Sequence, residues 1–451
     1  MPFENLLFYK TTGKAVLSYL IEILKIWWWV ILPFILRKPF LFLWRSWRIE
    51  HWLSTVYKPI LLEIKIPRES IKPIRAMEDV MASLHSVIYH PPDWWETWMD
   101  GQLQTSLSLE IASFGGAIHF FIRCEQSYRD SVEAAIYAQY PDAEISQADD
   151  YTKLVPQDMP NKDWDFWATD YTLLRKKSDK PGEPLSCYPI LTYKKFEKEP
   201  EIIEEKRVDP VATLFEALSK VKPGQQFWVQ IMIKPVTKDE SKWIEEGIIE
   251  RDRVAKREAT EGSIKTKPMV LEAAEILLKG ASEEEPQPKS EQIFPPEMKL
   301  TPGERDIVAA IEEKISKPGF ATSIRFIYLG KKDVFFKPNL RLGFSFFGSF
   351  ATQNLNSLIP WGKTITKIKK SRILPLNLLI PRRLYLRQRK IFRNYVNRDG
   401  PLHPRPGGDF VLNTEELATI FHFPSWRVAP VPGVARVEAR RRAPPELPVE
   451  E

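Results

Sequence analysis

Hydrophobic and polar positions alternate regularly between residues 55 and 155, and the period of the alternation changes along this stretch. Apolar residues recur at every second position where half-buried strands are expected, and at every third or fourth position where amphipathic helices are expected. The elements expected, in chain order, are strand 60–66, helix 73–89, strands 103–112 and 117–124, helix 128–140 and strand 143–146. The order βαββαβ predicts an α+β, ferredoxin-like unit in which Leu107, Leu109 and Ile111 face the core.

A second α+β unit is expected over residues 160–360. Its strands are predicted near 167–175, 189–193, 226–234 and 321–329, with a charged helical stretch at 240–258. Asp209-Pro210 is typical of a helix start, and so is Thr301 with Glu304 at the capping-box position. Residues 259–299 are rich in Pro and Glu, which predicts a disordered insertion. The pattern indicates a second ferredoxin-like unit with a long insertion.

The first 52 residues have the pattern of a membrane anchor. Residues 15–36 read AVLSYLIEILKIWWWVILPFIL, close to the roughly 20 apolar residues of a spanning helix. Trp27, Trp28 and Trp29 are typical of the boundary between lipid and water, and Arg37 and Lys38 follow. The positive-inside rule places the rest of the chain in the cytoplasm. An amphipathic helix lying in the membrane interface and a buried soluble helix are the alternatives.

Residues 361–400 differ from the rest in charge. About a dozen basic residues and no acidic one lie between residues 363 and 398, although the whole chain has a net charge of only +6. The basic residues considered as candidate contacts are Arg382, Arg383, Arg387, Arg389, Lys390 and Arg393. This segment is expected to contact nucleic-acid phosphates, anionic lipid headgroups, or simply solvent and protein. Interleaved aromatic residues suit base stacking and core packing equally well.

Catalytic and metal-binding patterns are weak. Gly362-Lys363-Thr364 resembles part of a phosphate-binding loop, but Ser357 stands where that motif requires its first glycine. The six histidines are scattered, and no GxSxG motif is present. Cys124 and Cys187 lie far apart outside any CxxC motif, which favours two buried thiols over a disulfide or a metal site. We therefore expect no enzyme activity and no cofactor.

The region 401–451 is expected to be a linker and docking segment. A short helix is predicted at 414–421, with Asn413 as its cap and Glu416 at the third position. The extended tail ARRRAPPELPVEE follows. The residues considered as docking candidates are Thr414, Glu415, Glu416, Leu417, Phe421, His422, Phe423 and Pro424.

The segment from Phe410 to Pro448 resembles a known junction. It is similar to the element ahead of the motor domain in bacterial type IV secretion and conjugative DNA-transfer ATPases of the HerA/FtsK superfamily. The match is close from Asn413 to Pro424, and Ala443–Pro448 matches with Glu446 in place of the usual Asn. Residues 300–330 and the Trp-rich start also resemble the non-motor region of these proteins. Neither Walker motif of the motor is present, so the ATPase would be a separate polypeptide or a part missing from this chain.

The resemblance implies a membrane-anchored, non-catalytic accessory protein on the cytoplasmic side of the cell membrane. Its expected partners are the membrane, a P-loop ATPase or other secretion component, and other subunits of an oligomeric assembly. The alternative is a membrane-associated module that binds nucleic acid, DNA included, through residues 363–398.

Overall fold

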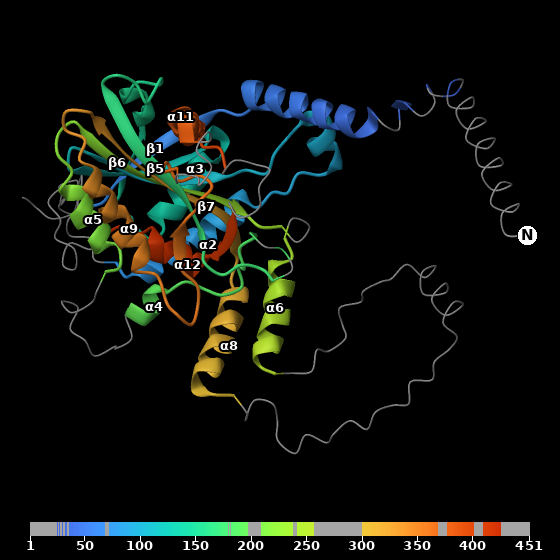
Figure 1. The fold of residues 1–451 in the computed structure, drawn as a ribbon. Helices are drawn as coiled ribbons and strands as arrows, with labels where there is room; N and C mark the ends of the chain where they lie inside the picture. The colour runs from blue at the N-terminus through green and yellow to red at the C-terminus, as the bar shows by residue number, and fades with distance from the viewer. Residues whose placement is uncertain are drawn as a thin grey trace, which may run out of the picture. The chain divides into compact units, whose positions relative to one another are not determined.

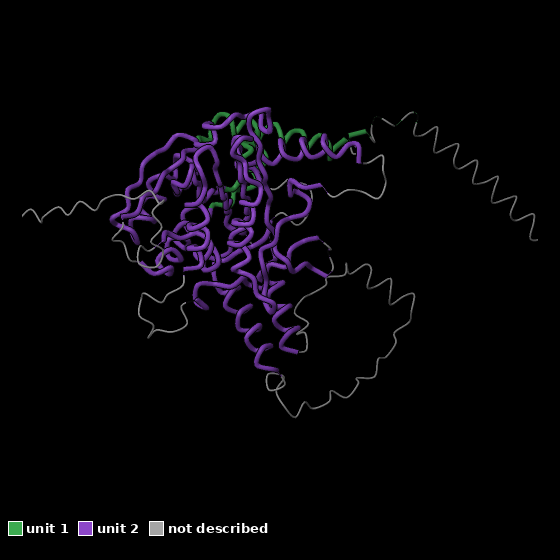
Figure 2. Tube along the Cα trace, turned by 60° about the vertical axis from the view of Figure 1, so that its left-hand side comes forward, with its two compact units in different colours: residues 1–58, 90–104 green, residues 59–89, 105–451 purple. Residues whose placement is uncertain are grey.

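Two units make up the described chain. The computed structural model describes residues 25, 27, 29, 32, 33, 36–67, 72–178, 180, 182–196, 209–237, 241–256, 300–368, 377–400 and 409–424. Unit 1 contains the described residues of 1–58 and 90–104, and unit 2 contains those of 59–89 and 105–451 (Figure 2). Each unit is considered by itself below.

Unit 1 consists of a helix over residues 36–55 and a loop with a short π-helical turn, Glu96–Asp100. The loop begins with a reciprocal pair of hydrogen bonds, because the Asp93 amide donates to Glu96 Oε2 and the Glu96 amide donates to Asp93 Oδ1. This pairing satisfies two amides at the start of the turn, as a capping box does at a helix N-terminus.

Unit 2 is built on one antiparallel sheet, which has nine strands among the described residues. The strands are β1 (Pro59–Lys65), β2 (Leu107–Phe114), β3 (Ala117–Glu125), β4 (Glu144–Ala148), β5 (Trp164–Leu173), β6 (Gln225–Pro235), β7 (Gly319–Lys331), β8 (Leu358–Pro360) and β9 (Phe410–Asn413). Their order is β4-β1-β3-β2-β6-β7-β5-β8, and β9 pairs with β7. The α+β class predicted from the sequence is confirmed.

The strand order repeats itself within the sheet. The strands of each half can be numbered one to four along the chain. From the outer edge of the sheet to its middle, both halves then have the order fourth, first, third, second: β4-β1-β3-β2 and β8-β5-β7-β6. The halves meet where β2 pairs antiparallel with β6, with Glu110 opposite Gln230 near the middle of the paired stretch. A sheet predicted as two separate α+β units is therefore continuous across this seam.

Helices cover both faces of the sheet (Figure 1). They are α2 (Ile74–Ile88), α3 (Arg129–Tyr137), α4 (Tyr193–Phe196), α5 (Ala212–Ser219), α6 (Trp243–Val254), α8 (Pro302–Ile315), α9 (Leu340–Gly348), α11 (Ile380–Asn397) and α12 (Thr414–Ile420). Short 3-10 turns occur at Gln126–Tyr128, Tyr151–Leu154 and Lys337–Asn339. α6 and α8 run side by side and extend away from the sheet.

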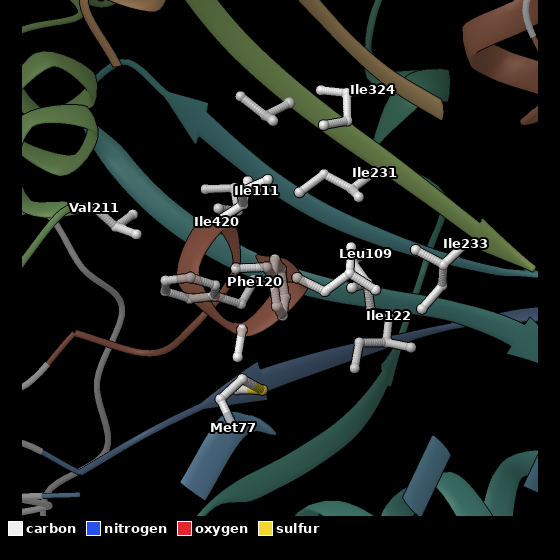
Figure 3. Packing of buried hydrophobic residues seen from close by; sticks show 14 of the residues in the cluster. Met77, Leu109, Ile111, Phe120, Ile122, Val211, Ile231, Ile233, Ile324 and Ile420 are labelled. Carbon is white, nitrogen blue, oxygen red and sulfur yellow. The ribbon is translucent and has the colours of Figure 1, made fainter. Parts of the chain in front are cut away.

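The larger core lies between the sheet and the layer formed by α2, α3, α5, α9 and α12. Figure 3 shows side chains from both halves of the sheet packed in it, including Leu109, Phe120, Ile231 and Ile324. The predicted inward positions Leu107, Leu109 and Ile111 are at most 1% exposed, which confirms the phase of the β2 alternation. Because the core crosses the β2–β6 seam, the two halves bury their apolar faces together.

The opposite face of the sheet carries a second core under α11. Ile391, Phe392 and Tyr395 of α11 pack against a set of sheet residues that includes Phe121 and Trp228. A sheet with helices on one face only would leave the polar positions of β2 in water. In this protein α11 covers that face, so these positions are buried.

The strand predicted at 189–193 is wrong. The segment is buried, but its amides bond to other groups: Ile190 donates to Glu416 Oε1, Leu191 to the carbonyl of Phe350, and Tyr193 to Thr419 Oγ1. Tyr193 itself begins α4. An apolar run shows burial, and it cannot show that side chains of a distant helix satisfy the backbone.

Candidate functional site

Exposed aromatic and apolar side chains gather on unit 1. Trp27 and Trp29 are 53% and 59% exposed, and Arg37 and Lys38 are exposed as well, whereas Trp28 lies outside the described residues. Further exposed large apolar residues of the unit are Leu32, Leu36, Phe40, Phe42, Leu43, Trp47, Leu53, Val56, Trp94 and Trp95. Within the described residues, no helix combines the length and apolarity needed to cross a bilayer.

The loop 90–104 belongs to this surface, although the hydrophobic pattern had suggested no role for it. It contributes Trp94, Trp95 and Trp98, and it is held against the helix over 36–55. The Trp44 indole Nε1 donates to the Trp98 carbonyl over 3.0 Å, and the Arg45 guanidinium lies 5.7 Å from the centre of the Trp98 ring. The signal in the sequence that could have pointed to it is the Trp-rich stretch DWWETW.

Gly101 makes the close contact between loop and helix possible. Its φ is +75°, and a Cβ at this position would lie 2.4 Å from the backbone carbonyl of Arg48. Both the left-handed conformation and the lack of space require glycine. The loop is therefore fitted closely to the helix.

The basic residues predicted at 382–393 lie on α11. Arg382, Arg383, Arg389, Lys390 and Arg393 are exposed, on a helix that has no acidic residue. Its opposite side is buried, because Ile391, Phe392 and Tyr395 pack in the second core. This division gives the helix a cationic outer face above an apolar inner face.

Arg387 differs from its basic neighbours. It is half-buried, and its Nη1 donates to the carbonyls of Ile365 and Lys367. Burial lowers the pKa of Arg387, with a further contribution from the nearby charge of Arg383. Arg387 fixes the preceding loop rather than extending the outer face.

A hollow of about 620 Å³ lies beside the outer face of α11. Arg389, Lys390 and Arg393 line it together with Tyr385 and Gln157. The Arg389 guanidinium lies 5.7 Å from the Tyr385 ring centre and donates to its hydroxyl over 3.0 Å. Three cations beside an accessible ring are the combination that binds phosphates next to planar bases.

Arg398, at the end of α11, directs its side chain to Glu110 of β2. It forms a buried polar cluster there that was not predicted. Its guanidinium donates to both carboxylate oxygens of Glu110, at 3.0 and 3.1 Å, and also pairs with Asp150. Tyr151 donates to Glu110 Oε2 over 2.7 Å, and its oxygen lies 2.7 Å from the Tyr395 hydroxyl. Because Tyr151 has one hydroxyl proton, Tyr395 is the donor in that second bond.

Arg398 is the cation that both carboxylates of this cluster share. Burial disfavours the charged guanidinium, but Glu110 and Asp150 outweigh it and raise the pKa of Arg398. Burial likewise opposes ionisation of Asp150, and hydrogen bonds from Arg398 and Thr152 outweigh it and lower the Asp150 pKa. Asp150 is held ionised beside a cation, and Glu110 is bonded to the same guanidinium, so the cluster fits a structural role better than acid–base chemistry.

The docking candidates at 414–424 lie inside the fold. Thr414, Glu415, Glu416, Leu417, Phe421, His422, Phe423 and Pro424 are all buried. The predicted cap is confirmed: Asn413 Oδ1 accepts from the Glu416 amide, and Glu416 Oε2 accepts from the Asn413 amide. The predicted short helix is therefore a core helix, α12, which packs on α2. Docking through these side chains stays a prediction that would need the segment to leave the core.

Ion pairs explain why so polar a segment can be buried. Lys314 and Glu416, both fully buried, approach to 2.9 Å. Glu415 pairs with Lys317 at 2.5 Å and with Lys194 at 3.0 Å. A buried charge is tolerated when a partner and hydrogen bonds compensate for the loss of hydration. The Thr-Glu-Glu sequence of α12 therefore lies in the protein interior, where its two carboxylates form ion pairs.

His422 is also engaged in this region. Its Nε2 lies 3.0 Å from Asp209 Oδ1, and its Nδ1 lies 2.9 Å from the carbonyl of Ala418. Burial opposes ionisation of Asp209, yet His422 and the amides of Val211 and Ala212 outweigh it and lower the Asp209 pKa. The pair links α12 to the start of α5.

The two cysteines and the Gly-Lys-Thr motif that were considered for chemistry lie in surroundings that suit a structural role. Cys124 and Cys187 are buried free thiols, and burial raises the pKa of each to about 12, which makes them poor nucleophiles. Thr364 accepts from the Asp170 amide in a turn after β8, unlike the helix-opening Thr of a phosphate-binding loop. Among the described residues, no group of His, Cys, Asp and Glu is arranged to hold a metal ion.

Comparison with known proteins gives a family. No curated protein matches the chain. A family profile described as a domain of unknown function, DUF8128, matches residues 53–357, which cover β1 to β7 and reach the residue before β8. The match spans more than half of the chain, and the protein therefore belongs to the DUF8128 family.

Proposed function

We propose that this protein attaches to a membrane surface through unit 1 and acts there as a non-catalytic accessory protein. The observation that carries the proposal is the exposed aromatic and apolar surface of unit 1, which includes Phe42, Leu43, Trp47 and Trp95. Monomeric soluble proteins rarely leave so many large apolar side chains close together in water. Tryptophan beside Arg and Lys is the composition of groups that lie at a lipid–water boundary.

The cationic residues of unit 1 favour an anionic leaflet. Arg37, Lys38 and Arg45 are exposed on the same helix as Phe42 and Leu43. Basic residues near an anionic bilayer contribute about 1 kcal/mol each at the cytoplasmic surface. This supports the proposed location at the cytoplasmic side of the cell membrane.

The fold proposed for unit 2 is a tandem of two ferredoxin-like units. Its support is the twice-repeated strand order together with the element order, in which α2 and α3 in the first half correspond to α5 and α9 in the second. The long insertion lies between β6 and β7, where the first half has only the Gly115-Gly116 turn. Such a sheet would serve as a rigid platform for partners.

Vesicle flotation tests membrane attachment. The full chain should float with vesicles of phosphatidylcholine and phosphatidylglycerol, and the triple variant Phe42→Ser, Leu43→Ser, Trp95→Ser should lose most of this binding. The matched control replaces three similarly exposed apolar residues of unit 2, namely Leu154, Leu174 and Phe336, with Ser. Equal flotation of the two triple variants would refute attachment through unit 1.

The proposed partner is the P-loop ATPase of a type IV secretion or conjugative DNA-transfer system. Its support is the resemblance of residues 410–448 to the junction ahead of such motors. Removal of the whole segment from Phe410 is a poor test, because β9 and α12 would leave the core. A chain ending at Pro424 keeps both elements. We expect this chain to fold and to lose co-purification with the ATPase encoded by a neighbouring gene; retained binding would contradict a docking role for the tail.

The second candidate function is nucleic-acid binding through α11. The observation in its favour is the exposed cationic face with the adjoining hollow and Tyr385. Single-stranded DNA should bind with a strong dependence on salt, and removal of each cation that meets a phosphate should reduce the slope of log K against log salt by about 0.7. The test variant changes Arg382, Arg383, Arg389 and Arg393 to Gln.

A charge-matched control separates specific contact from net charge. It changes four exposed lysines elsewhere on unit 2, Lys153, Lys162, Lys220 and Lys222, to Gln. Both variants lose four positive charges. If both weaken DNA binding equally, the α11 face is not the binding site.

A further inference from the structure

Unit 1 contains a groove of about 420 Å³ between its helix and its loop. Arg37, Phe40, Leu41 and Trp44 recur at i, i+3, i+4 and i+7, so they share one face of the helix. Trp94, Trp98 and Met99 of the loop form the opposite wall. Its size lies within the range of small-ligand sites.

Defined contacts join the helix and the loop that form the groove. The Trp44 indole donates to the Trp98 carbonyl, and the Arg45 guanidinium lies 5.7 Å from the centre of the Trp98 ring. Gly101 fixes the loop against the helix backbone. The groove is therefore a formed feature of unit 1.

The lining selects a particular chemistry. Of its seven residues, six are apolar or aromatic and one, Arg37, is charged. The indole N–H of Trp44 is already bonded to Trp98. An extended peptide would need partners for its own amides and carbonyls, which this lining does not offer. An alkyl chain with a single anionic group at one end has complementary chemistry.

We infer that the groove binds one acyl chain of a membrane phospholipid, with the lipid phosphate at Arg37. The inference rests on the proposed attachment of unit 1 to a membrane, and it names the ligand of that surface. Exposed Phe40 and Trp94, 62% and 65% accessible, stand at the rim, where they would contact the remaining lipid. The adjacent Lys38 adds a second cation near the headgroup.

Direct lipid binding tests the inference with groove-filling variants. The full chain is titrated with dihexanoyl-phosphatidylglycerol below its micelle concentration, and native mass spectrometry is used to detect phospholipid retained from the membrane. Leu41→Trp and Met99→Trp fill the groove from opposite walls, and each should weaken binding about tenfold or more. Ser46→Trp, at an exposed polar position on the same helix, is the control and should bind as the native chain does.

The headgroup contact has its own pair of variants. Arg37→Gln should weaken binding of the short phospholipid several-fold, and Lys58→Gln, an exposed cation elsewhere on unit 1, should not. Unchanged binding in both groove-filling variants would overturn the inference, and so would recovery of a peptide instead of phospholipid.

Flotation separates this inference from the proposed function. The groove-filling variants keep Phe42, Leu43 and Trp95, so they should still float with vesicles. If the native chain floats but retains no phospholipid, the groove inference fails and attachment stands. If the short phospholipid binds but the native chain does not float, attachment fails and the groove site stands.

Discussion

Arg398 adopts a conformation that its residue type does not favour. Its φ of +57° is in the left-handed region, where a non-glycine residue costs about 1–2 kcal/mol. The same conformation ends α11 and directs the side chain to Glu110 and Asp150. Glycine would relieve the backbone and leave the buried Glu110 without its cation. The ion pairs therefore explain why an arginine occupies a position suited to glycine.

We expect Arg398→Gln to lower the free energy of unfolding by about 3–5 kcal/mol, the usual result of breaking a buried ion pair. Glu110→Gln should have an effect of similar size. Because each substitution removes the same interaction, the double variant should lose clearly less than the sum of the single losses. Urea unfolding of the four proteins measures this coupling; simple additivity would show that the two side chains do not act as a pair.

Asp150 gives the cluster a dependence on pH. Its pKa is lowered in the folded protein, so its contribution is complete above the unfolded value near 4 and is lost as the pH falls through the lower, folded value. Asp150→Asn should cost about 1.5–3 kcal/mol at pH 7, the range for hydrogen bonds to charged groups. The difference from the native protein should shrink below pH 4.

Urea unfolding at several pH values between 7 and 3 measures this trend. The neighbouring Asp149 is exposed, so Asp149→Asn should change stability little at any of these pH values. A loss for Asp150→Asn that stays constant down to pH 3 would contradict the assigned role of its ionised form.

At the scale of single elements, local signals were reliable and non-local ones were not. The caps of α8 and α12 were predictable, because a capping box depends on two residues three positions apart. The short β8 and β9 were not predicted, since each exists only through pairing with a distant strand. The burial of α12 was missed for the same reason: its charges are matched by Lys314 and Lys317.

The two faces of α11 also illustrate this limit. The sequence identified its basic residues, but it could not show which side of the helix packs and on what. Phe392 is 2% exposed and contacts Phe166 with ring centres 5.7 Å apart. We expect Phe392→Ala to cost about 3–5 kcal/mol in urea unfolding.

The control for α11 is Leu386→Ala. Leu386 is 55% exposed, so its truncation should change stability by at most about 0.5 kcal/mol. If Phe392→Ala were equally harmless, the second core would not depend on α11, and the basic face would be free to move away from the sheet.

At the scale of the whole molecule, the continuous sheet could not be read from the chain. The alternation predicted the strands on each side of the seam correctly, but β2 and β6 are more than a hundred residues apart. The pairing of two edges carries no local signature. The second helical layer was equally hidden, so the alternation along β2 gave no sign that Glu110 is buried.

A shared core across the seam predicts shared stability. Ile111 of β2 and Ile231 of β6 are at most 1% exposed in the same cluster. Each substitution to Ala should cost about 2–5 kcal/mol and should reduce hydrogen-exchange protection in α3 and α9 alike, although these helices belong to opposite halves. Ile311→Ala removes an equally buried side chain from a separate small cluster on α8 and should loosen α6 and α8 alone. If Ile111→Ala weakened only α3, the halves would unfold as independent units, and the sheet would be two domains in contact.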